Sequence, residues 1–282
     1  MVQLTPLYGG PSPLTMDGAP DDQREPLLRQ RTRLSDTLAS FTDEQWHTAS
    51  RCAGWTNQDV IAHLIGTNRF WAASVRAGID GAPSQYLVGF DPVATPRQMV
   101  EPMRSMTSSE VLDQLRASND ALFAEVATLD DAGWSKPAES PPGHVPIRLL
   151  AAHALWDAWV HERDVLLPLG IMPDEEPDEV RSCLRYAAAL GPVLALSHHP
   201  GQRGALAIDV TDTGECVVVE VADGVTVHSG IAPAQAARLS GRGIDLVEAF
   251  SIRAPLSQSV ADDDAWLLDG LAMVFDSPDF AR

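Results

Sequence analysis

The segment Trp156–Asp164 is the sequence feature that most constrains the fold, because it predicts a helix with a metal-binding face. Asp157 and His161 are four residues apart, so on an α-helix their side chains lie on one face, one turn apart. A carboxylate and an imidazole in this arrangement can hold one divalent metal, but they need a third ligand from elsewhere. His63 is the best candidate, and two histidines with one carboxylate leave a coordination position open, as in catalytic zinc sites.

Each of these residues also has a simpler structural interpretation. A single histidine among apolar helix residues, such as His63, is more often a hydrogen-bonded core residue than a metal ligand. Asp157 and His161 alone could form an ion pair on the helix surface. However, Trp156 and Trp159 indicate that part of this face is buried, and a buried carboxylate and imidazole need a partner. A metal is one such partner.

Three further residues are candidates for supporting roles. His153 precedes Asp157 by one turn and could be a fourth ligand, although a core position is the commoner interpretation. Asp164 could hold the imidazole of His161 through its other nitrogen. Arg253 could form a structural salt bridge or act in catalysis as a clamp for a substrate carboxylate, since arginine binds carboxylates through two parallel hydrogen bonds.

The N-terminal part of the chain has the periodicity of helices. Apolar residues recur at helical spacing in four stretches, 22–42, 56–76, 108–129 and 147–167. Thr56 and Asp59 form the pattern of a helix N-cap, and the Pro- and Gly-containing residues 79–106 are predicted to be a long loop. Four amphipathic helices with such connections predict a four-helix bundle.

The pattern changes after residue 169. An acidic linker leads into a predicted helix at 178–197, which is followed by alternating segments at 205–210, 216–221 and 225–229. The short turns between these segments indicate hairpins, and two short helices are expected near 233–240 and 243–250. The prediction is a flexible arm at 1–21, a helical bundle at 22–172 and an α+β domain with an antiparallel sheet at 173–282.

Composition limits the possible partners and the compartment. The formal net charge of −19 argues against nucleic acid or an anionic membrane surface as the main partner. Cys52, Cys183 and Cys216 are far apart and odd in number, so we expect no disulfide framework. We find neither the pattern of a signal peptide nor an apolar run of membrane-spanning length. A cytoplasmic protein, monomeric or homodimeric, is the expectation.

Two motifs resemble those of the mycothiol-dependent maleylpyruvate isomerase family, within the wider group of DinB-like metal-binding bundles. The first motif is Cys52-Ala-Gly-Trp-Thr-Asn-Gln-Asp-Val-Ile-Ala-His-Leu64, and the second is Leu155-Trp-Asp-Ala-Trp-Val-His-Glu-Arg-Asp-Val165. A weaker likeness extends over Asp245–Pro255, which resembles part of the family's sterol-carrier-like C-terminal domain. Together the likeness covers most of residues 22–260.

The resemblance implies a divalent metal, usually zinc, held by His63, Asp157 and His161. It also implies that mycothiol, a low-molecular-weight thiol, is a cofactor or co-substrate. The family pattern has Glu where this chain has the shorter Asp157, and the substrate-binding arginine of the family corresponds only loosely to Arg253. Such a protein would add a metal-activated thiolate to an electrophilic small molecule, by cis–trans isomerisation or by thiol transfer.

Two other function classes remain open from the sequence. The chain could be a non-enzymatic protein that binds a small molecule or lipid, or a metal hydrolase that activates water at the open coordination position. Metal content would separate the first alternative from the enzyme, and dependence of turnover on a thiol would separate the second.

Overall fold

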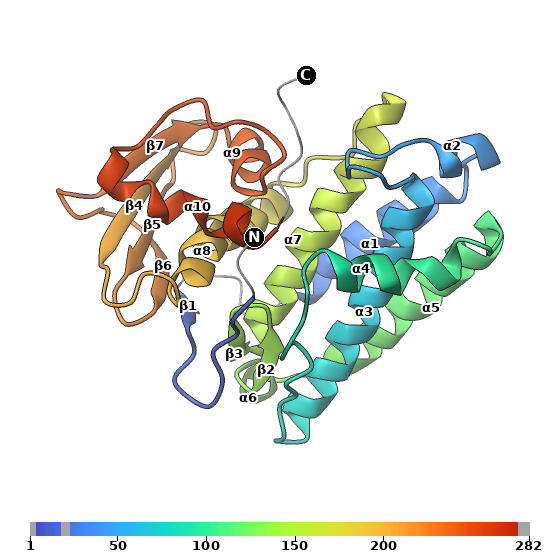
Figure 1. Cartoon of the computed structure of the whole chain (residues 1–282), viewed down its shortest axis with the longest axis horizontal. Coiled ribbons are helices and arrows are strands. Elements are labelled where there is room, and N and C mark those ends of the chain that lie inside the picture. The colour runs from blue at the N-terminus through green and yellow to red at the C-terminus, as the bar shows by residue number, and fades with distance from the viewer. Residues whose placement is uncertain (1–3, 18–22, 276–282) are drawn as a thin grey trace.

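The computed structural model describes residues 4–17 and 23–275. Four long helices make up most of the N-terminal part, and they lie on the right in Figure 1. They are α1 (Arg24–Leu38), α3 (Asn57–Ile79), α5 (Ser108–Val126) and α7 (Ile147–Leu166). Helices α1 and α3 each contact both α5 and α7. The four predicted helical stretches are therefore confirmed, and α3 brings His63 to the same group of helices as Asp157 and His161.

Local sequence accounts for where these helices begin. Thr56 and Asp59 form a capping box at the start of α3, in which each side chain accepts from the other residue's backbone N–H, as predicted. Thr107 and Glu110 cap α5 in the same way. Helix α7 follows Pro146, whose ring fixes a backbone angle that suits the entry into a helix.

Shorter elements connect the long helices. They are α2 (Asp43–His47), α4 (Ala94–Val100), η1 (Glu101–Met103), α6 (Asp131–Trp134), the hairpin of β2 (Pro137–Ser140) and β3 (Gly143–Pro146), and η2 (Leu167–Leu169). The prediction of a loop throughout 79–106 was wrong for α4 and η1. Val100 and Met103 of these elements are buried against the core. This packing stabilises two short helices, although Pro96 and Pro102 make the segment look like a loop in the sequence.

The C-terminal part combines a sheet with helices, on the left in Figure 1. Its elements are α8 (Pro177–Ala195), β4 (Gly204–Val210), β5 (Cys216–Val221), β6 (Val225–Ser229), β7 (Ala237–Gly241), α9 (Gly243–Phe250), η3 (Asp262–Asp264) and α10 (Trp266–Val274). Helix α8 contacts β5 and β6 on one side and α7, α9 and α10 on others. It thereby connects the sheet to the helices that carry the candidate ligands.

The sheet is mixed, so the prediction of an antiparallel sheet was correct only for its centre. The strand order is β1-β6-β5-β4-β7, where β1 is Leu14–Met16. The hairpin-connected strands β4, β5 and β6 pair antiparallel, whereas the edge strands β1 and β7 pair parallel with β6 and β4. Short turns impose antiparallel pairing, but β1 and β7 reach the sheet through longer connections, which leave the direction to packing.

Two sequence predictions fail for the same reason. Residues 4–17 of the predicted flexible arm pack against the molecule, with Leu4 and Leu14 buried and Leu14 opposite Val225 in the sheet. The rest of that prediction, residues 1–3 and 18–21, lies outside the described residues. The predicted helix at 233–240 is wrong as well, because Ala237–Gly241 pairs with β4 as strand β7. A strand of three to five residues depends on its partner more than on its own pattern.

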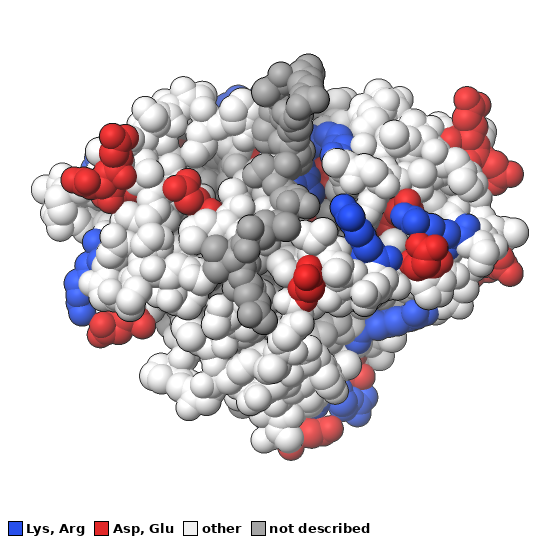
Figure 2. Space-filling view, viewed as in Figure 1, with Lys and Arg blue, Asp and Glu red and all other residues white. Residues whose placement is uncertain are grey.

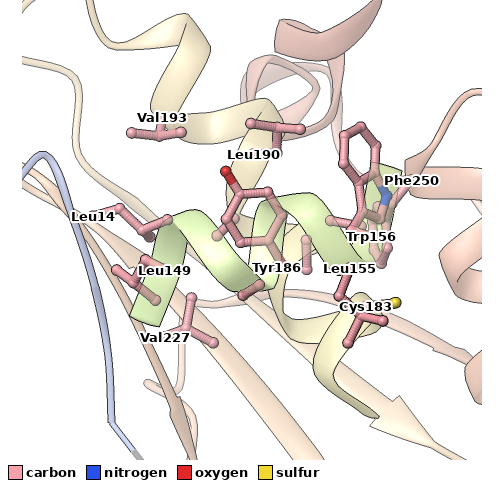
Figure 3. Close-up of a cluster of buried hydrophobic side chains, with 14 of the residues drawn as sticks. Leu14, Leu149, Leu155, Trp156, Cys183, Tyr186, Leu190, Val193, Val227 and Phe250 are labelled. Carbon is pink, nitrogen blue, oxygen red and sulfur yellow. The ribbon is translucent and has the colours of Figure 1, made fainter. Parts of the chain in front are cut away.

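The core between α7, α8 and the sheet is drawn in Figure 3. Tyr186 of α8 and Trp156 of α7 lie in it, together with Leu14 of β1 and Val227 of β6. All four belong to one cluster of buried apolar side chains. Helix α7 is therefore buried on several sides, and this packing fixes the direction in which Asp157 and His161 point.

The face of the molecule in Figure 2 carries scattered acidic and basic side chains separated by wide uncharged areas. Its blue side chains do not gather into one broad basic patch. Within residues 4–17 and 23–275, none of the helices combines the length and the apolar character that a membrane crossing requires.

Candidate functional site

Helices α3 and α7 bring the three predicted metal ligands together. His63 Nε2 lies 3.8 Å from Asp157 Oδ1, and His161 Nε2 lies 3.6 Å from the same oxygen. One ligand atom from each residue falls within 4.8 Å of the others. Ligand atoms around a tetrahedral zinc ion are about 3.4 Å apart, given metal–ligand distances of about 2.0–2.2 Å. The three side chains therefore fit a single divalent ion after shifts of a few tenths of an ångström.

Neighbouring groups orient these ligands. Thr67 Oγ1 donates a hydrogen bond to Asp157 Oδ2 at 3.2 Å, which leaves Oδ1 turned toward the histidines. The rings of His63 and His161 meet edge to face with centroids 4.9 Å apart, and Trp55 packs against His63. Burial disfavours the charged form of Asp157, but the neighbouring imidazoles of His63 and His161 hold the pKa of this carboxyl well below its usual value. It is thus an anionic ligand at neutral pH.

Asp164 binds the other nitrogen of His161, as the sequence predicts. The Nδ1–H of His161 donates to Asp164 Oδ2 at 2.9 Å, and the Asp164 side chain is completely buried. Burial opposes protonation of His161, but the hydrogen bond to Asp164 and the nearby Cys52 and Asp157 raise the pKa of His161 to about 10. A metal at Nε2 therefore displaces a proton from the ring, while Asp164 keeps the second proton on Nδ1.

Arg253 is directed at Asp164. Its Nε lies 2.9 and 3.1 Å from the two carboxylate oxygens, and its Nη2 donates to Oδ2 at 3.0 Å. The preceding residue, Ile252, has a φ of +52°, an unusual value for a β-branched residue, and it turns the chain so that Arg253 faces inward. This geometry supports the salt-bridge interpretation, because the arginine fork that would clamp a substrate carboxylate already binds Asp164.

A wider ion-pair network surrounds Asp164. Arg51, between α2 and α3, binds Asp164 Oδ1 at 3.0 Å and Glu248 Oε2 of α9 at 2.7 Å. Arg163 of α7 binds the other oxygen of Glu248 at 2.7 Å. The C-terminal part of the chain therefore helps to hold the carboxylate that orients His161.

Cys52 is a site residue that the sequence analysis missed. Its Sγ donates to Asp164 Oδ2 at 3.2 Å and lies 3.8 Å from both His161 Nδ1 and Arg253 Nη2. Gly54, at a φ of +77°, allows the turn in which Trp55 N–H donates to the Cys52 carbonyl, and this turn places the thiol beside α7. The only signal in the sequence was the position of Cys52 eleven residues before His63, in one motif.

Cys52, His161 and Asp164 form a second group with metal-ligand spacing. Both oxygens of Asp164 already accept hydrogen bonds from arginine or histidine, and Nδ1 of His161 is occupied. In the group of His63, Asp157 and His161, no arginine is among the described hydrogen-bond or ion-pair partners of Asp157, so no arginine competes with a metal for this carboxylate. It is the better candidate for a metal.

His153 lies outside both groups of possible ligands. Its Nδ1 is 2.6 Å from the hydroxyl oxygen of Tyr186, and its ring packs between Trp71 and Trp156. Burial lowers the pKa of His153 to about 4, so the imidazole is neutral near pH 7. The structure supports the core interpretation of this histidine, although His153 is also one of the residues that line the adjoining cavity.

A cavity of about 460 Å³ opens beside these residues. Its lining includes the three candidate ligands together with Cys52, His153 and Arg253. The remaining described wall is mainly apolar, and much of it comes from α3, α4, α7 and the segment 86–93. Such a cavity has the size and composition of a small-molecule binding site.

Comparison with known proteins gives a family and a fold. Residues 27–166 match a family described as "Mycothiol maleylpyruvate isomerase N-terminal domain". The chain is also similar to a crystal structure of the mycothiol-dependent maleylpyruvate isomerase and to one of a histidine-to-alanine mutant of it. Each comparison has a TM-score of 0.60 and 14% identity, and covers 86% of this chain and 92% of that chain. No curated protein matches.

Proposed function

Because the chain belongs to the mycothiol maleylpyruvate isomerase family through residues 27–166, we propose that it is a metal-dependent enzyme that uses a low-molecular-weight thiol. Mycothiol is the proposed thiol, and an electrophilic small molecule is the proposed substrate. The observation that carries the proposal is the approach of two histidine nitrogens to one oxygen of Asp157, 3.8 and 3.6 Å away, at the wall of a cavity.

The donor set suits thiol chemistry. A divalent metal, when bound, lowers the pKa of a thiol that coordinates it, so the sulfur becomes a nucleophile at neutral pH. His63 and His161 provide neutral nitrogens and Asp157 provides one negative charge, so the site keeps a net positive charge that favours an anionic fourth ligand. Asp164 fixes the ring of His161 while Arg51 and Arg253 hold Asp164 in place.

The apolar cavity wall would shield the reacting atoms from water. With a cis-unsaturated carbonyl compound, addition of the thiol sulfur, rotation about the resulting single bond and elimination give the trans isomer. With a substrate that carries a leaving group, the same attack gives thiol transfer. The site geometry supports both reactions, and a domain shared by a family does not by itself fix the reaction.

We extend the proposal to the finer features expected from the sequence. Zinc is the proposed metal, and residues 22–172 are proposed to be a DinB-like four-helix bundle, followed by a C-terminal domain at 173–282. A cytoplasmic monomer or homodimer without nucleic-acid or membrane partners fits the net charge of −19.

The alternative of a non-enzymatic binding protein is favoured by one observation, the apolar wall of the cavity. Cobalt substitution tests the enzyme against it. Cobalt-loaded protein should develop a thiolate-to-metal charge-transfer band when mycothiol or a simpler thiol is added, and His161→Ala should abolish that band. His228→Ala, on β6 and away from the site, is the matched control. A cobalt spectrum that no thiol perturbs would contradict the proposal.

A further inference from the structure

The cavity beside the candidate ligands has an aromatic wall. Trp71 and Phe70 of α3, Trp156 of α7 and Phe90 line it, and Val160 adds an aliphatic surface next to His161. The rings of Phe70 and Trp71 pack edge to face with centroids 4.6 Å apart. A volume of about 460 Å³ lies in the range of cavities that bind drug-sized molecules. The wall therefore suits a ligand with a bulky apolar body.

The described lining contains few basic residues that could pair with a small dicarboxylate. Among the described lining residues, Arg97 and Arg253 are the arginines, and there is no lysine. Arg253 already pairs with Asp164 through Nε and Nη2, and Arg97 is exposed on α4. A carboxylate that enters an apolar site without a hydrogen-bonded partner loses its hydration without compensation. Apart from the proposed metal, the described lining thus offers one arginine, Arg97, that Asp164 does not engage, which disfavours a ligand with two carboxylates relative to an apolar one.

His153 supplies a polar group within the apolar surroundings. Tyr186 lies 2.6 Å from Nδ1, and no described residue forms a hydrogen bond with Nε2, on the opposite side of the ring. If the Tyr186 hydroxyl donates to Nδ1, the neutral ring carries its hydrogen on Nε2. We assign this tautomer, in which Nε2–H is available to donate to an oxygen of a ligand in the cavity.

We propose that the electrophile is a bulky aromatic or alicyclic α,β-unsaturated ketone, rather than a small dicarboxylate, whose carbonyl oxygen accepts a hydrogen bond from His153 Nε2. This inference rests on the proposed function. The thiol sulfur forms a bond to the β-carbon while the electron pair of the C=C bond moves toward the carbonyl oxygen. The proton leaves the thiol for solvent, and solvent protonates the α-carbon, or the sulfur departs and the C=C bond forms again. No oxidant or reductant is needed.

Binding of an unreactive ketone tests the apolar part of the proposal. In isothermal titration calorimetry with metal-loaded protein, 4-phenylbutan-2-one should bind at least tenfold more tightly than maleate. Phe90→Ala should weaken ketone binding by about tenfold, because it removes apolar contact area from the wall. Phe123→Ala is the matched control, since Phe123 is also partly buried but lies on α5 outside the cavity, and it should leave binding unchanged.

The role of His153 has a separate readout. His153→Phe keeps a ring of similar size but removes the donor, so it should weaken 4-phenylbutan-2-one binding about fivefold or more and leave n-butylbenzene binding unchanged. His153→Gln retains an N–H donor, so it should bind the ketone more tightly than His153→Phe. It also provides a second test of the role of His153 if His153→Phe does not fold. Equal losses for ketone and hydrocarbon would overturn the hydrogen-bonding role.

The experiments distinguish failure of the substrate class from failure of the proposed function. If maleate binds as tightly as the ketone, and Phe90→Ala behaves like Phe123→Ala, the substrate class is wrong while metal content and thiol binding still support the proposed function. If the protein binds neither metal nor thiol, the proposed function fails and the assignment of an electrophile fails with it, whatever the ketone affinity.

Discussion

The carboxylates on the two sides of the His161 ring differ in how completely they are hydrogen-bonded. On the Nδ1 side, Asp164 accepts hydrogen bonds from His161, Arg51 and Arg253 at 2.9–3.1 Å. On the Nε2 side, the distances from Asp157 Oδ1 to the two histidine nitrogens are 3.6 and 3.8 Å, longer than hydrogen bonds. Two aspartates on one helix therefore occupy opposite environments.

This difference indicates different tasks for the two carboxylates. Asp164 is surrounded by cations and donors, so it is suited to orient His161 and to connect α7 with the C-terminal part of the chain. Asp157 has a threonine and two imidazoles around it, which leaves one oxygen free for a metal. Spacing along the helix alone does not distinguish a ligand from an orienting residue, because both lie within one turn of His161.

Loss of a ligand should give the largest effect. We expect His63→Ala and His161→Ala each to weaken metal binding by more than about 100-fold, since outer-sphere changes alone typically weaken it by roughly 10–100-fold. Competitive titration with a metal indicator, followed by metal analysis after dialysis, measures this effect. His228→Ala should bind metal like the unchanged protein, and full metal retention in both ligand variants would refute the site.

Removing the charge of each aspartate in turn should separate their tasks. Asp164→Asn should lower the free energy of unfolding by about 3–5 kcal/mol, because it removes the completely buried charge that Arg51, Arg253 and His161 share. Asp157→Asn should change stability much less but lower metal affinity more. Urea unfolding of metal-free protein and metal titration of both variants check this pair. Equal effects of the two substitutions on both measurements would remove the distinction.

His153 extends the comparison to an imidazole that faces a tyrosine instead of a carboxylate. Its pKa in the folded protein is lowered by burial from 6.5 to about 4, so the unfolded chain binds more protons in this range. The contribution of His153 to stability is therefore complete above about pH 6.5 and decreases as the pH falls toward 4, by roughly 3 kcal/mol. His153→Gln should remove this part of the pH dependence, measured by urea unfolding at pH 7 and pH 4. An unchanged pH dependence in that variant would contradict the assignment.

Arg253→Gln should have the smallest effect of the set. Asp164 retains Arg51 and His161 in this variant, so we expect a loss of about 1–3 kcal/mol in unfolding free energy, below that of Asp164→Asn. Metal affinity should fall by no more than about tenfold. If turnover of a neutral ketone and of a carboxylate substrate is measured, both should decrease equally. A selective loss for the carboxylate would instead show that Arg253 binds substrate.

The parts of the site that depend on local geometry could be predicted from the sequence. The helical period places Asp157 and His161 on one face whatever surrounds the helix, and the capping pattern of Thr56 and Asp59 fixes the start of α3. The same holds for β4, β5 and β6, whose alternation and short turns specify both strands and pairing. These patterns also sufficed for a resemblance that the family match supports.

Only the tertiary structure decided the contacts between distant parts of the chain. The pairing of Arg253 with Asp164, the position of Cys52 beside His161 and the addition of Leu14–Met16 to the sheet join residues from 89 to more than 200 positions apart. Each depends on which surfaces pack together once the apolar faces of α7 and α8 are buried, and no local period encodes that choice. The sequence by itself therefore determined which side chains α7 presents together, whereas the packing of the rest of the chain determined which of them remain free to bind a ligand.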